Sequence, residues 1–395
     1  IFLLIGNISA VDINNTVQSS NVNLNEVITS NEINEQDVLS ISDENEIYGR
    51  GSSKDLQKLV DNAQGTLDLN DNYEFTGSSE AVKISKDITI NGNGHVINGD
   101  DQARIFNIDR HTVVLNNITF IKGKSDDGGA IFASPTSSLS IDSCRFENNT
   151  AKNGGAIYLK YFKSIIMESS FFKNNSATAT GGAIYYYGDY GNKELFNITG
   201  TFINNRAGVD GGAIYEHDIV NYHLKGNFTN NTAGRNGGAV CSDSVFVIGT
   251  ISIDGIFDSN AAAFGGAVYC FNPFGNFTGI YQNNRASQDG GAIYMVRSSV
   301  RYGMPNTISG EFYSNTAKGQ GSAVCAMNLS DKDVDLHDSI FMKNSGKSTL
   351  YSSGYAYLNV HDSIFVENIG DKVLDTSKDY AVDGRLKAYN NWFGH

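Results

Sequence analysis

The stretches Gly181-Gly182-Ala183-Ile184-Tyr185 and Gly211-Gly212-Ala213-Ile214-Tyr215 are two copies of a unit that recurs along this chain. Gly-Gly-Ala followed by Ile or Val occurs eight times, counting one copy that reads Gly-Ser-Ala-Val, and successive copies are spaced by 25 to 31 residues. The copies begin at Gly128, Gly154, Gly181, Gly211, Gly237, Gly265, Gly290 and Gly321. A unit of that length is too small to bury a core alone and must stack on its neighbours. The repeat therefore predicts an all-β fold, a right-handed single-stranded parallel β-helix (β-solenoid) with about 25–31 residues per coil.

Aligning the copies produces columns of similar residues. The residue after Ala is always Ile or Val, and a second column is aromatic from Phe146 to Phe365. Stiff aliphatic and aromatic side chains stacked at strand spacing predict two ladders inside the solenoid.

A third column is asparagine, three residues after each aromatic residue. Asn tolerates the left-handed turn conformation, and stacked amides can hydrogen-bond from coil to coil. We therefore expect a structural ladder of Asn149, Asn175, Asn205, Asn231, Asn260, Asn284, Asn315, Asn344 and Asn368.

A fourth column follows the aliphatic one directly, so it is expected on the opposite, outward face of the strand. It is rich in tyrosine, and such a stripe either packs on itself along the exposed strands or contacts sugar rings or a partner's aromatic groups. Both interpretations stay open, and the candidate ligand-binding residues are Tyr158, Tyr185, Tyr215, Tyr269 and Tyr294.

The variation in coil length falls on one side of the coil. From the aromatic residue to the next Gly-Gly the distance is always 8 or 9 residues, whereas from Gly-Gly to the next aromatic residue it runs from 16 to 22. Insertions collected on one face of a repeat protein often mark a binding face, although neutral drift in surface loops gives the same pattern. The face includes residues 159–170, 186–200, 216–226, 270–279 and 295–310.

The regions before the repeats differ from them in composition. Residues 1–10 resemble the end of a secretory signal peptide, and residues 11–51 form an acidic segment expected to be a disordered spacer. Residues 52–86 are expected to hold an N-terminal cap and the first strands. The cap is predicted to be an amphipathic helix over 53–64, with Ser53 as its capping residue, that covers the open end of the solenoid. Residues 87–395 are then the parallel β-helix, which we expect to be truncated at its C-terminus.

The net charge limits the classes of binding partner, and the cysteine positions bear on disulfide formation. The net charge of −14 argues against a nucleic-acid partner, and no later stretch is long and apolar enough to span a bilayer. Cys241 and Cys325 share a register three coils apart, while Cys241 and Cys270 are one residue out of register, so we expect free thiols. We also expect the chain to be a monomer. Sequons such as those at Asn117, Asn148 and Asn197 make glycosylation an expectation for an exported chain.

Residues able to perform chemistry are scattered. Asp127, Asp210 and Asp289 precede Gly-Gly in non-adjacent coils, where an Asx turn explains them better than a paired acid and base. The seven histidines show neither metal spacing nor a shared register, so no catalytic residue, metal site or cofactor is assigned.

Gly-Gly-Ala-Ile combined with Phe-x-x-Asn resembles the paired motif of chlamydial polymorphic outer-membrane proteins. The segment from the capping helix through Ile88-Thr89-Ile90-Asn91-Gly92, together with the end at Asn391-Trp392-Phe393-Gly394, is similar to adhesin-like β-helix surface proteins of methanogenic archaea. The resemblance covers about residue 52 to the C-terminus. It implies a parallel β-helix (pectin lyase-like fold) and an exported, cell-surface location.

From these features we expect a non-enzymatic, adhesin-like protein, secreted or held at the cell surface, that contacts cell-surface glycans or proteins of another cell. Two alternatives stay open: a β-helix polysaccharide lyase or glycoside hydrolase, and a structural surface-layer component.

Overall fold

The fold is described from a computed structural model, which covers residues 51–77, 80–188, 195–218, 221–244, 250–273, 275–297, 306–328, 333–354, 357–376 and 386–394. The expected signal peptide (1–10) and nearly all of the acidic spacer (11–51) lie outside the described residues.

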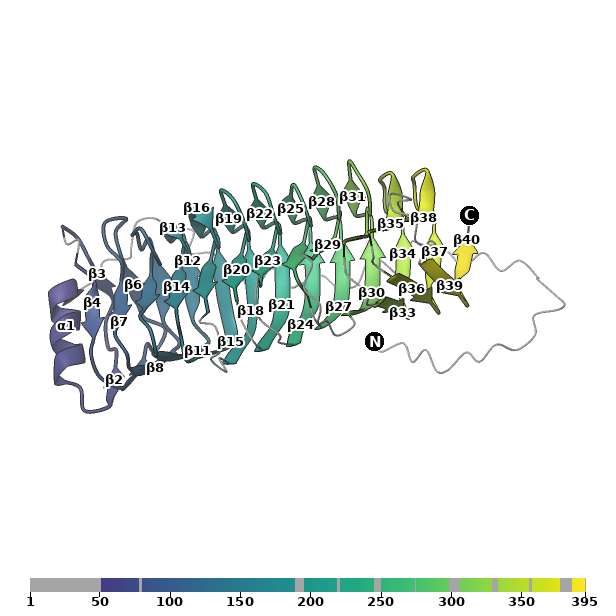
Figure 1. Cartoon of the computed structure of the whole chain (residues 1–395). Helices are drawn as coiled ribbons and strands as arrows, with labels where there is room; N and C mark the ends of the chain where they lie inside the picture. Colours follow the sequence, from purple (N-terminus) through teal and green to yellow (C-terminus); the bar gives the residue numbers. More distant parts are fainter. Residues whose placement is uncertain are drawn as a thin grey trace, which may run out of the picture. The chain divides into compact units, whose positions relative to one another are not determined.

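The described chain is a right-handed parallel β-solenoid with one short helix at its N-terminal end (Figure 1). Its strands form three parallel sheets of 21, 12 and 7 strands, which we call sheets A, B and C. In a typical coil the chain passes from a long strand of sheet A to a short strand of sheet C, then to sheet B, and returns to sheet A one layer further along. The predicted fold class is therefore confirmed.

Every strand pairs with the equivalent strands of neighbouring coils. Sheet A contains β1 (Gly51–Ser52), β2 (Thr66–Asp68), β3 (Tyr73–Glu74), β5 (Ile88–Asn91), β6 (Val96–Asn98), β8 (Thr112–Asn116), β9 (Thr119–Ile121), β11 (Ser138–Asp142), β12 (Arg145–Glu147), β15 (Ser164–Lys173), β18 (Leu195–Ile203), β21 (Asn221–Thr229), β24 (Thr250–Asp258), β27 (Gly275–Gln282), β30 (Asn306–Tyr313), β33 (Asp333–His337), β34 (Ile340–Met342), β36 (Tyr357–His361), β37 (Ile364–Val366), β39 (Leu386–Tyr389) and β40 (Trp392–Gly394). Sheet B contains β4 (Val82–Ile84), β7 (Phe106–Ile108), β10 (Ile131–Ala133), β14 (Ile157–Lys160), β17 (Ile184–Tyr187), β20 (Ile214–His217), β23 (Val240–Asp243), β26 (Val268–Phe271), β29 (Ile293–Val296), β32 (Val324–Met327), β35 (Ser348–Ser353) and β38 (Lys372–Thr376). Sheet C contains β13 (Thr150–Asn153), β16 (Ser176–Thr180), β19 (Arg206–Ala207), β22 (Thr232–Ala233), β25 (Ala261–Ala262), β28 (Arg285–Ala286) and β31 (Thr316–Ala317).

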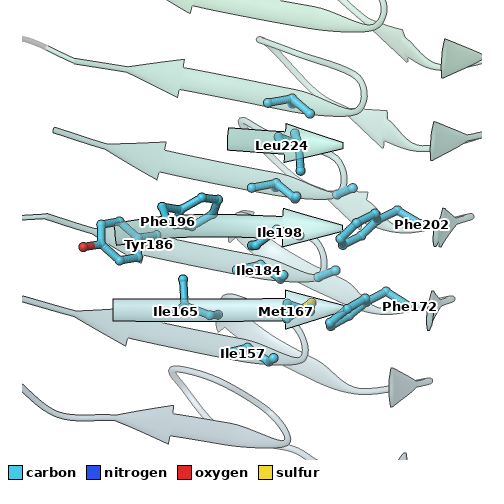
Figure 2. Packing of buried hydrophobic residues seen from close by; sticks show 14 of the residues in the cluster. Ile157, Ile165, Met167, Phe172, Ile184, Tyr186, Phe196, Ile198, Phe202 and Leu224 are labelled. Carbon is cyan, nitrogen blue, oxygen red and sulfur yellow. The ribbon is translucent and has the colours of Figure 1, made fainter. Parts of the chain in front are cut away.

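The interior is filled by the two predicted ladders. The aliphatic column from Ile131 to Val324 pairs in strict register along sheet B and is buried. On sheet A the rings from Phe120 to Phe393 stack with centroids 4.7 to 5.1 Å apart. Figure 2 shows how Ile157 and Ile184 from sheet B face Phe172 and Phe202 from sheet A across the same narrow core.

The Gly-Gly pair makes the corner between sheets C and B. The first glycine adopts a positive φ, as at Gly211 (66°), a conformation that costs glycine little. The second lies directly against the backbone of the next coil, because a Cβ on Gly212 would overlap the carbonyl oxygen of Gly238. The corner therefore requires glycine twice, once for its torsion angle and once for the close approach.

The asparagine column makes the corner between sheets A and C. The members from Asn149 to Asn344 are buried, and Asn368 is half-buried. The side chains bridge three coils: Asn205 Nδ2 donates to the Phe172 carbonyl oxygen of the preceding coil and to Asn231 Oδ1 of the next coil, both at 3.0 Å. Asn205 Oδ1 in turn accepts from the backbone N–H and Nδ2 of Asn175. The same pattern runs through Asn149, Asn175, Asn205, Asn231, Asn260, Asn284, Asn315 and Asn344. Asn368 accepts from Asn344 and donates to the Phe341 carbonyl oxygen.

The expectation that the ladder asparagines adopt the left-handed turn conformation was wrong. The left-handed residue is the one before each ladder asparagine, for example Asn148 (φ 56°), Asn204 (φ 55°) or Ser259 (φ 58°), whereas none of the ladder residues has a positive φ. The ladder position thus selects asparagine for its amide, which donates and accepts at once, and the preceding exposed position selects for the torsion angle.

The N-terminal end is covered by α1 (Ser53–Asn62), whose N-cap is Ser52 rather than the predicted Ser53, because the Ser52 side chain forms a capping box with Asp55. Leu56 and Val60 are buried against the first coils. Gln57 accepts from the backbone N–H of Lys83 (2.7 Å) and donates to its carbonyl oxygen (3.0 Å), so α1 satisfies part of the edge that β4 would otherwise present. Within the described residues, no helix has the length and apolar character needed to cross a bilayer.

The strand bounds show which part of the coil varies in length. It falls on the connections from sheet B to sheet A, which range from residues 161–163 between β14 and β15 to residues 297–305 between β29 and β30. Much of the face defined from the sequence is therefore ordinary paired strand, and the variable part is confined to these connections.

Candidate functional site

The tyrosine column lies on the outward side of sheet B, in register from Phe132 through Tyr158, Tyr185 and Tyr215 to Tyr294. None of its members belongs to the hydrophobic core inside the solenoid. The side chains are nevertheless only partly accessible, and Tyr215 and Tyr294 are each 9% exposed. The tyrosine side chains therefore point outward, as expected. The strand surface on which they lie is largely covered, whereas we expected it to be exposed.

Side chains from the turns that precede the sheet B strands pack against this column at Phe132 and Tyr294. The guanidinium of Arg104 lies 4.9 Å from the Phe132 ring centroid, and the Phe264 ring packs against Tyr294 at 5.2 Å. Tyr215 donates a hydrogen bond from its hydroxyl to Asp243 Oδ2 (3.1 Å). Burial, reinforced by Asp127 and neighbouring tyrosines, raises the pKa of Tyr158 to about 12, so its phenol stays protonated at neutral pH.

The rings also cover one another. Phe132, Tyr158, Tyr185 and Tyr215 form one continuous stack with centroid separations of 5.4, 4.7 and 5.2 Å, and Tyr269 and Tyr294 form a second at 5.5 Å. Both faces of the Tyr158 and Tyr185 rings are therefore occupied by neighbours. A ligand of this column would meet ring edges and hydroxyl groups rather than ring faces; contact with a ligand stays a prediction.

The inward column that contains Leu159 and Tyr186 carries a carboxyl group where β20 pairs with β23. Glu216 occupies an inward position next to Tyr186, is fully buried, and hydrogen-bonds to Ser242 of the next coil. Burial raises the pKa of Glu216 to about 8, while the Ser242 hydrogen bond opposes the shift. A glutamate in a column of Leu159 and Tyr186 was visible in the alignment, but sequence reasoning did not single it out.

On the outward side of the same coils lies a second polar cluster. His217 Nε2 is 3.1 Å from Asp218 Oδ2, its Nδ1 is 3.8 Å from Asp243 Oδ2, and Tyr187 stacks on its ring with centroids 4.9 Å apart. Hydrogen bonding to Asp218 and then to Asp243 raises the pKa of His217 to about 10, so the imidazole is cationic at neutral pH. This cluster brings together an imidazolium, two carboxylates and the Tyr215 phenol.

The aspartates before Gly-Gly have another role than the one expected. Asp127 Oδ1 accepts from Asn153 Nδ2 (2.9 Å), Asp210 accepts from the Asn236 backbone and from Arg235, and Asp289 Oδ1 accepts from the Gln320 backbone. Each carboxylate thus binds the turn of the next coil, so the proposed Asx turn is wrong. They act as inter-coil links, and the structure does not bring the three together.

Two histidines share a register that sequence analysis missed. His337 and His361 pair directly between β33 and β36, with rings stacked at 5.4 Å. The Nδ1 atom of each contacts the following aspartate, Asp338 or Asp362. Among the described residues, no group of three or more His, Cys, Asp or Glu side chains is arranged to hold a metal ion.

All four cysteines are buried free thiols, as predicted. Cys241 pairs with Tyr269, and Cys270 with Ser242, which confirms the one-residue offset between the two cysteines. Burial raises the pKa of all four thiols, so they act as small apolar groups of the solenoid.

Two open grooves lie near the ends of the solenoid. One, of about 780 Å³, is on the outward side of sheet B in the first coils and is lined by polar and charged side chains from Glu80 to Asp126. The other, of about 700 Å³, lies in the last coils between Lys343 and Gly394.

Comparison with known proteins gives one match. Residues 143–160, 169–187, 199–215 and 226–243 match the Chlamydia polymorphic membrane protein repeat. Each matched segment runs from the end of a sheet A strand across the asparagine corner and Gly-Gly into sheet B, which is the part of the coil with constant length. The segments are a minor part of the chain, so the similarity describes these coils. No curated protein and no solved structure matches the chain.

Proposed function

We propose that this chain is part of an exported surface protein that adheres to another cell, a host surface or a glycan through the outward face of its solenoid. The observation that carries the proposal is the match of four coils to the repeat of Chlamydia polymorphic membrane proteins, on a fold that displays the same positions coil after coil. The comparable motifs of adhesin-like β-helix proteins from methanogenic archaea support the same conclusion.

The adhesive surface in this proposal has two parts. One is the tyrosine column of sheet B, whose ring edges and hydroxyl groups lie along successive coils at strand spacing. The other is the set of sheet B to sheet A connections, which vary in length while the rest of the coil is constant. A rigid scaffold that carries variable connections is the usual arrangement of binding surfaces in repeat proteins.

The proposal includes the organisation expected from the sequence. In it, residues 1–10 belong to a secretion signal, residues 11–51 are a spacer, and the solenoid acts as a monomer. Its role is contact rather than catalysis.

Binding of the purified chain to whole cells and to a broad glycan panel tests the proposal. We expect binding above that of an unrelated β-solenoid, with reduced binding after Tyr158→Ala and Tyr185→Ala. Absence of binding to both cells and glycans would remove the main support for an adhesive role.

One cluster favours a second candidate, cleavage of a polysaccharide. His217 lies between Asp218 and Asp243 beside the Tyr215 hydroxyl, which is a set of groups able to move a proton. If this candidate holds, incubation with acidic polysaccharides releases new reducing ends or unsaturated products, and His217→Ala abolishes the release.

A further inference from the structure

The ring column of sheet B ends at Phe132 on its N-terminal side, and a groove lies beyond it. The register of the column continues backwards from Phe132 to Asn107 and then to Lys83. These two positions carry polar side chains instead of rings, and the groove of about 780 Å³ opens beside them. That volume lies within the range of about 300–1,000 Å³ usual for small-ligand sites.

Three successive coils form the walls of this groove. Glu80 and Lys83 come from the first coil, Asp101 and Arg104 from the turn before β7, and Lys124 and Asp126 from the turn before Gly128. In the later coils the equivalent space lies over tyrosines and is covered by turn residues such as Phe264. The groove therefore lies where the ring column of sheet B ends.

The walls are held rigidly by bonds within the protein. Arg104 donates to the Asp127 carbonyl oxygen (2.7 Å from Nη2), to Gly128 O (3.2 Å) and to Ser125 Oγ (2.8 Å). The Lys124 N–H donates to Ala103 O (2.9 Å), which joins the two turns. Because these bonds occupy Arg104, its role is to shape the groove and to cover the Phe132 ring.

Other polar groups that line the groove are uncommitted. Within the described part of the chain, the side chains of Lys83, Asn107 and Asp101 make no hydrogen bond or ion pair, and Lys83 and Asp101 are exposed. The charged groups of the walls balance, with Lys83, Arg104 and Lys124 against Glu80, Asp101 and Asp126. The groove thus offers separate donors and acceptors without net charge.

We propose that this groove binds a short, uncharged oligosaccharide. Sugar hydroxyl groups donate to carboxylates and accept from lysine and amide N–H groups at once, which is the combination that Asp101, Lys83 and Asn107 present. A pre-formed rigid wall reduces the ordering cost of such binding. The inference rests on the adhesive function proposed above and assigns its carbohydrate contact to the first three coils of sheet B rather than to the tyrosine faces.

The test uses the full chain and titration calorimetry with neutral trisaccharides (cellotriose, mannotriose and maltotriose) and with trigalacturonate as the acidic probe. We expect one neutral trisaccharide to bind, and Lys83→Ala or Asn107→Ala to weaken that binding about ten-fold without lowering the unfolding temperature. The matched controls are Lys318→Ala and Asn197→Ala, since both residues are exposed and neither lines the groove. Both control variants should bind like the unaltered chain.

The outcomes separate this inference from the adhesive function. If the chain binds cells or glycans but the Lys83 and Asn107 variants bind as well as the controls, the groove assignment is overturned and adhesion stands. Binding of trigalacturonate alone, weakened by salt, also overturns the assignment, because it indicates recognition of charge. A chain that binds neither cells nor any saccharide contradicts both proposals.

Discussion

Buried asparagine amides connect the coils of this solenoid atom by atom. Asn205→Ala removes the acceptor of the Asn175 N–H and the donor of the Phe172 carbonyl, both in the buried corner. Since each buried polar group left without a partner costs about 1–3 kcal/mol, we expect a loss of roughly 2–5 kcal/mol in the free energy of unfolding. Urea denaturation, with hydrogen exchange to localise the effect, measures it.

The neighbouring residue provides the control for that change. Asn204 is exposed and has a φ of 55°, so Asn204→Gly keeps the torsion angle and is expected to change stability by less than about 1 kcal/mol. Equal losses of unfolding free energy in the two variants would show that the ladder amide contributes no more to stability than its exposed neighbour.

The close approach of the backbones at Gly212 and Gly238 leads to a second prediction for single residues. A Cβ at Gly212 would overlap the Gly238 carbonyl oxygen, so Gly212→Ala requires two coils to separate, and we expect it to cost about 3 kcal/mol or more. Gly65→Ala is the comparison: unlike Gly212, Gly65 has a positive φ (87°), but a Cβ there meets no atom within 4 Å. That variant bears only the torsional cost of about 1 kcal/mol. Thermal unfolding of the two variants should differ accordingly, and similar losses would contradict the packing argument.

The buried carboxyl of Glu216 predicts a dependence of stability on pH. Its folded pKa of about 8 exceeds the ordinary value of 4.5, so the folded chain binds the proton more tightly than the unfolded chain. The stability contribution is therefore complete below pH 4.5 and is lost as the pH rises towards 8, with a slope approaching about 1.4 kcal/mol per pH unit. His217, whose pKa is raised to about 10, acts in the same direction between pH 6.5 and 10.

Glu216→Gln isolates the carboxyl, since glutamine cannot ionise. We expect the variant to lose less stability than the unaltered chain between pH 5 and pH 7.5, measured by urea denaturation at each pH. Glu168→Gln, at an exposed residue of β15, should leave the pH dependence unchanged. A pH dependence as steep in Glu216→Gln as in the unaltered chain would assign the effect to other groups.

At the scale of elements, α1 determines how the solenoid begins. Leu56 is fully buried, whereas Leu59, one turn along the same helix, is 39% exposed. Leu56→Ala is expected to cost about 2–5 kcal/mol and Leu59→Ala less than about 1 kcal/mol. Hydrogen exchange of β4 and β7 should accelerate only in the first variant, and equal exchange in both would show that α1 does not stabilise these strands.

Residue columns that recur once per coil could be predicted from the sequence, because equivalent positions in every coil have the same packing requirement. The aliphatic and aromatic ladders and the offset of Cys241 from Cys270 follow from register alone, and the structure agrees. The sequence did not predict that the tyrosine column is covered, because the cover depends on how far the turn before each sheet B strand folds back over sheet B. Glu216 and the pairing of His337 with His361 were missed for another reason: each occurs in one or two coils, so no repeated column drew attention to it.

The same limit applies to the candidate site. Tyr158 and Tyr185 were identified as a stripe, but only the ring separations show that their faces are occupied. The groove beside Lys83 and Asn107 lies before the first Gly-Gly copy, where the repeat alignment did not extend. Its walls come from turns of three coils, and a linear pattern does not show that such turns converge.

For the whole molecule, the pairing pattern predicts how the chain tolerates removal of its ends. The strands of sheets A, B and C pair with equivalents in adjacent coils, so the stability of a coil depends on its neighbours and little on distant parts. A chain ending at Gly354 loses only β36 to β40 and keeps α1. We expect it to remain folded, with an unchanged circular dichroism signal per residue.

A chain starting at Asp87 makes the opposite change, because it loses α1 and β4 and leaves β7 without cover from either. We expect it to form oligomers or aggregates, since an uncovered row of backbone N–H and C=O groups pairs readily with other chains. Size-exclusion chromatography with light scattering compares the two truncated chains at equal concentration. If the chain starting at Asp87 stays monomeric and the chain ending at Gly354 does not, the cap is not what keeps this solenoid from associating, and the role assigned to Gln57 and Leu56 is wrong.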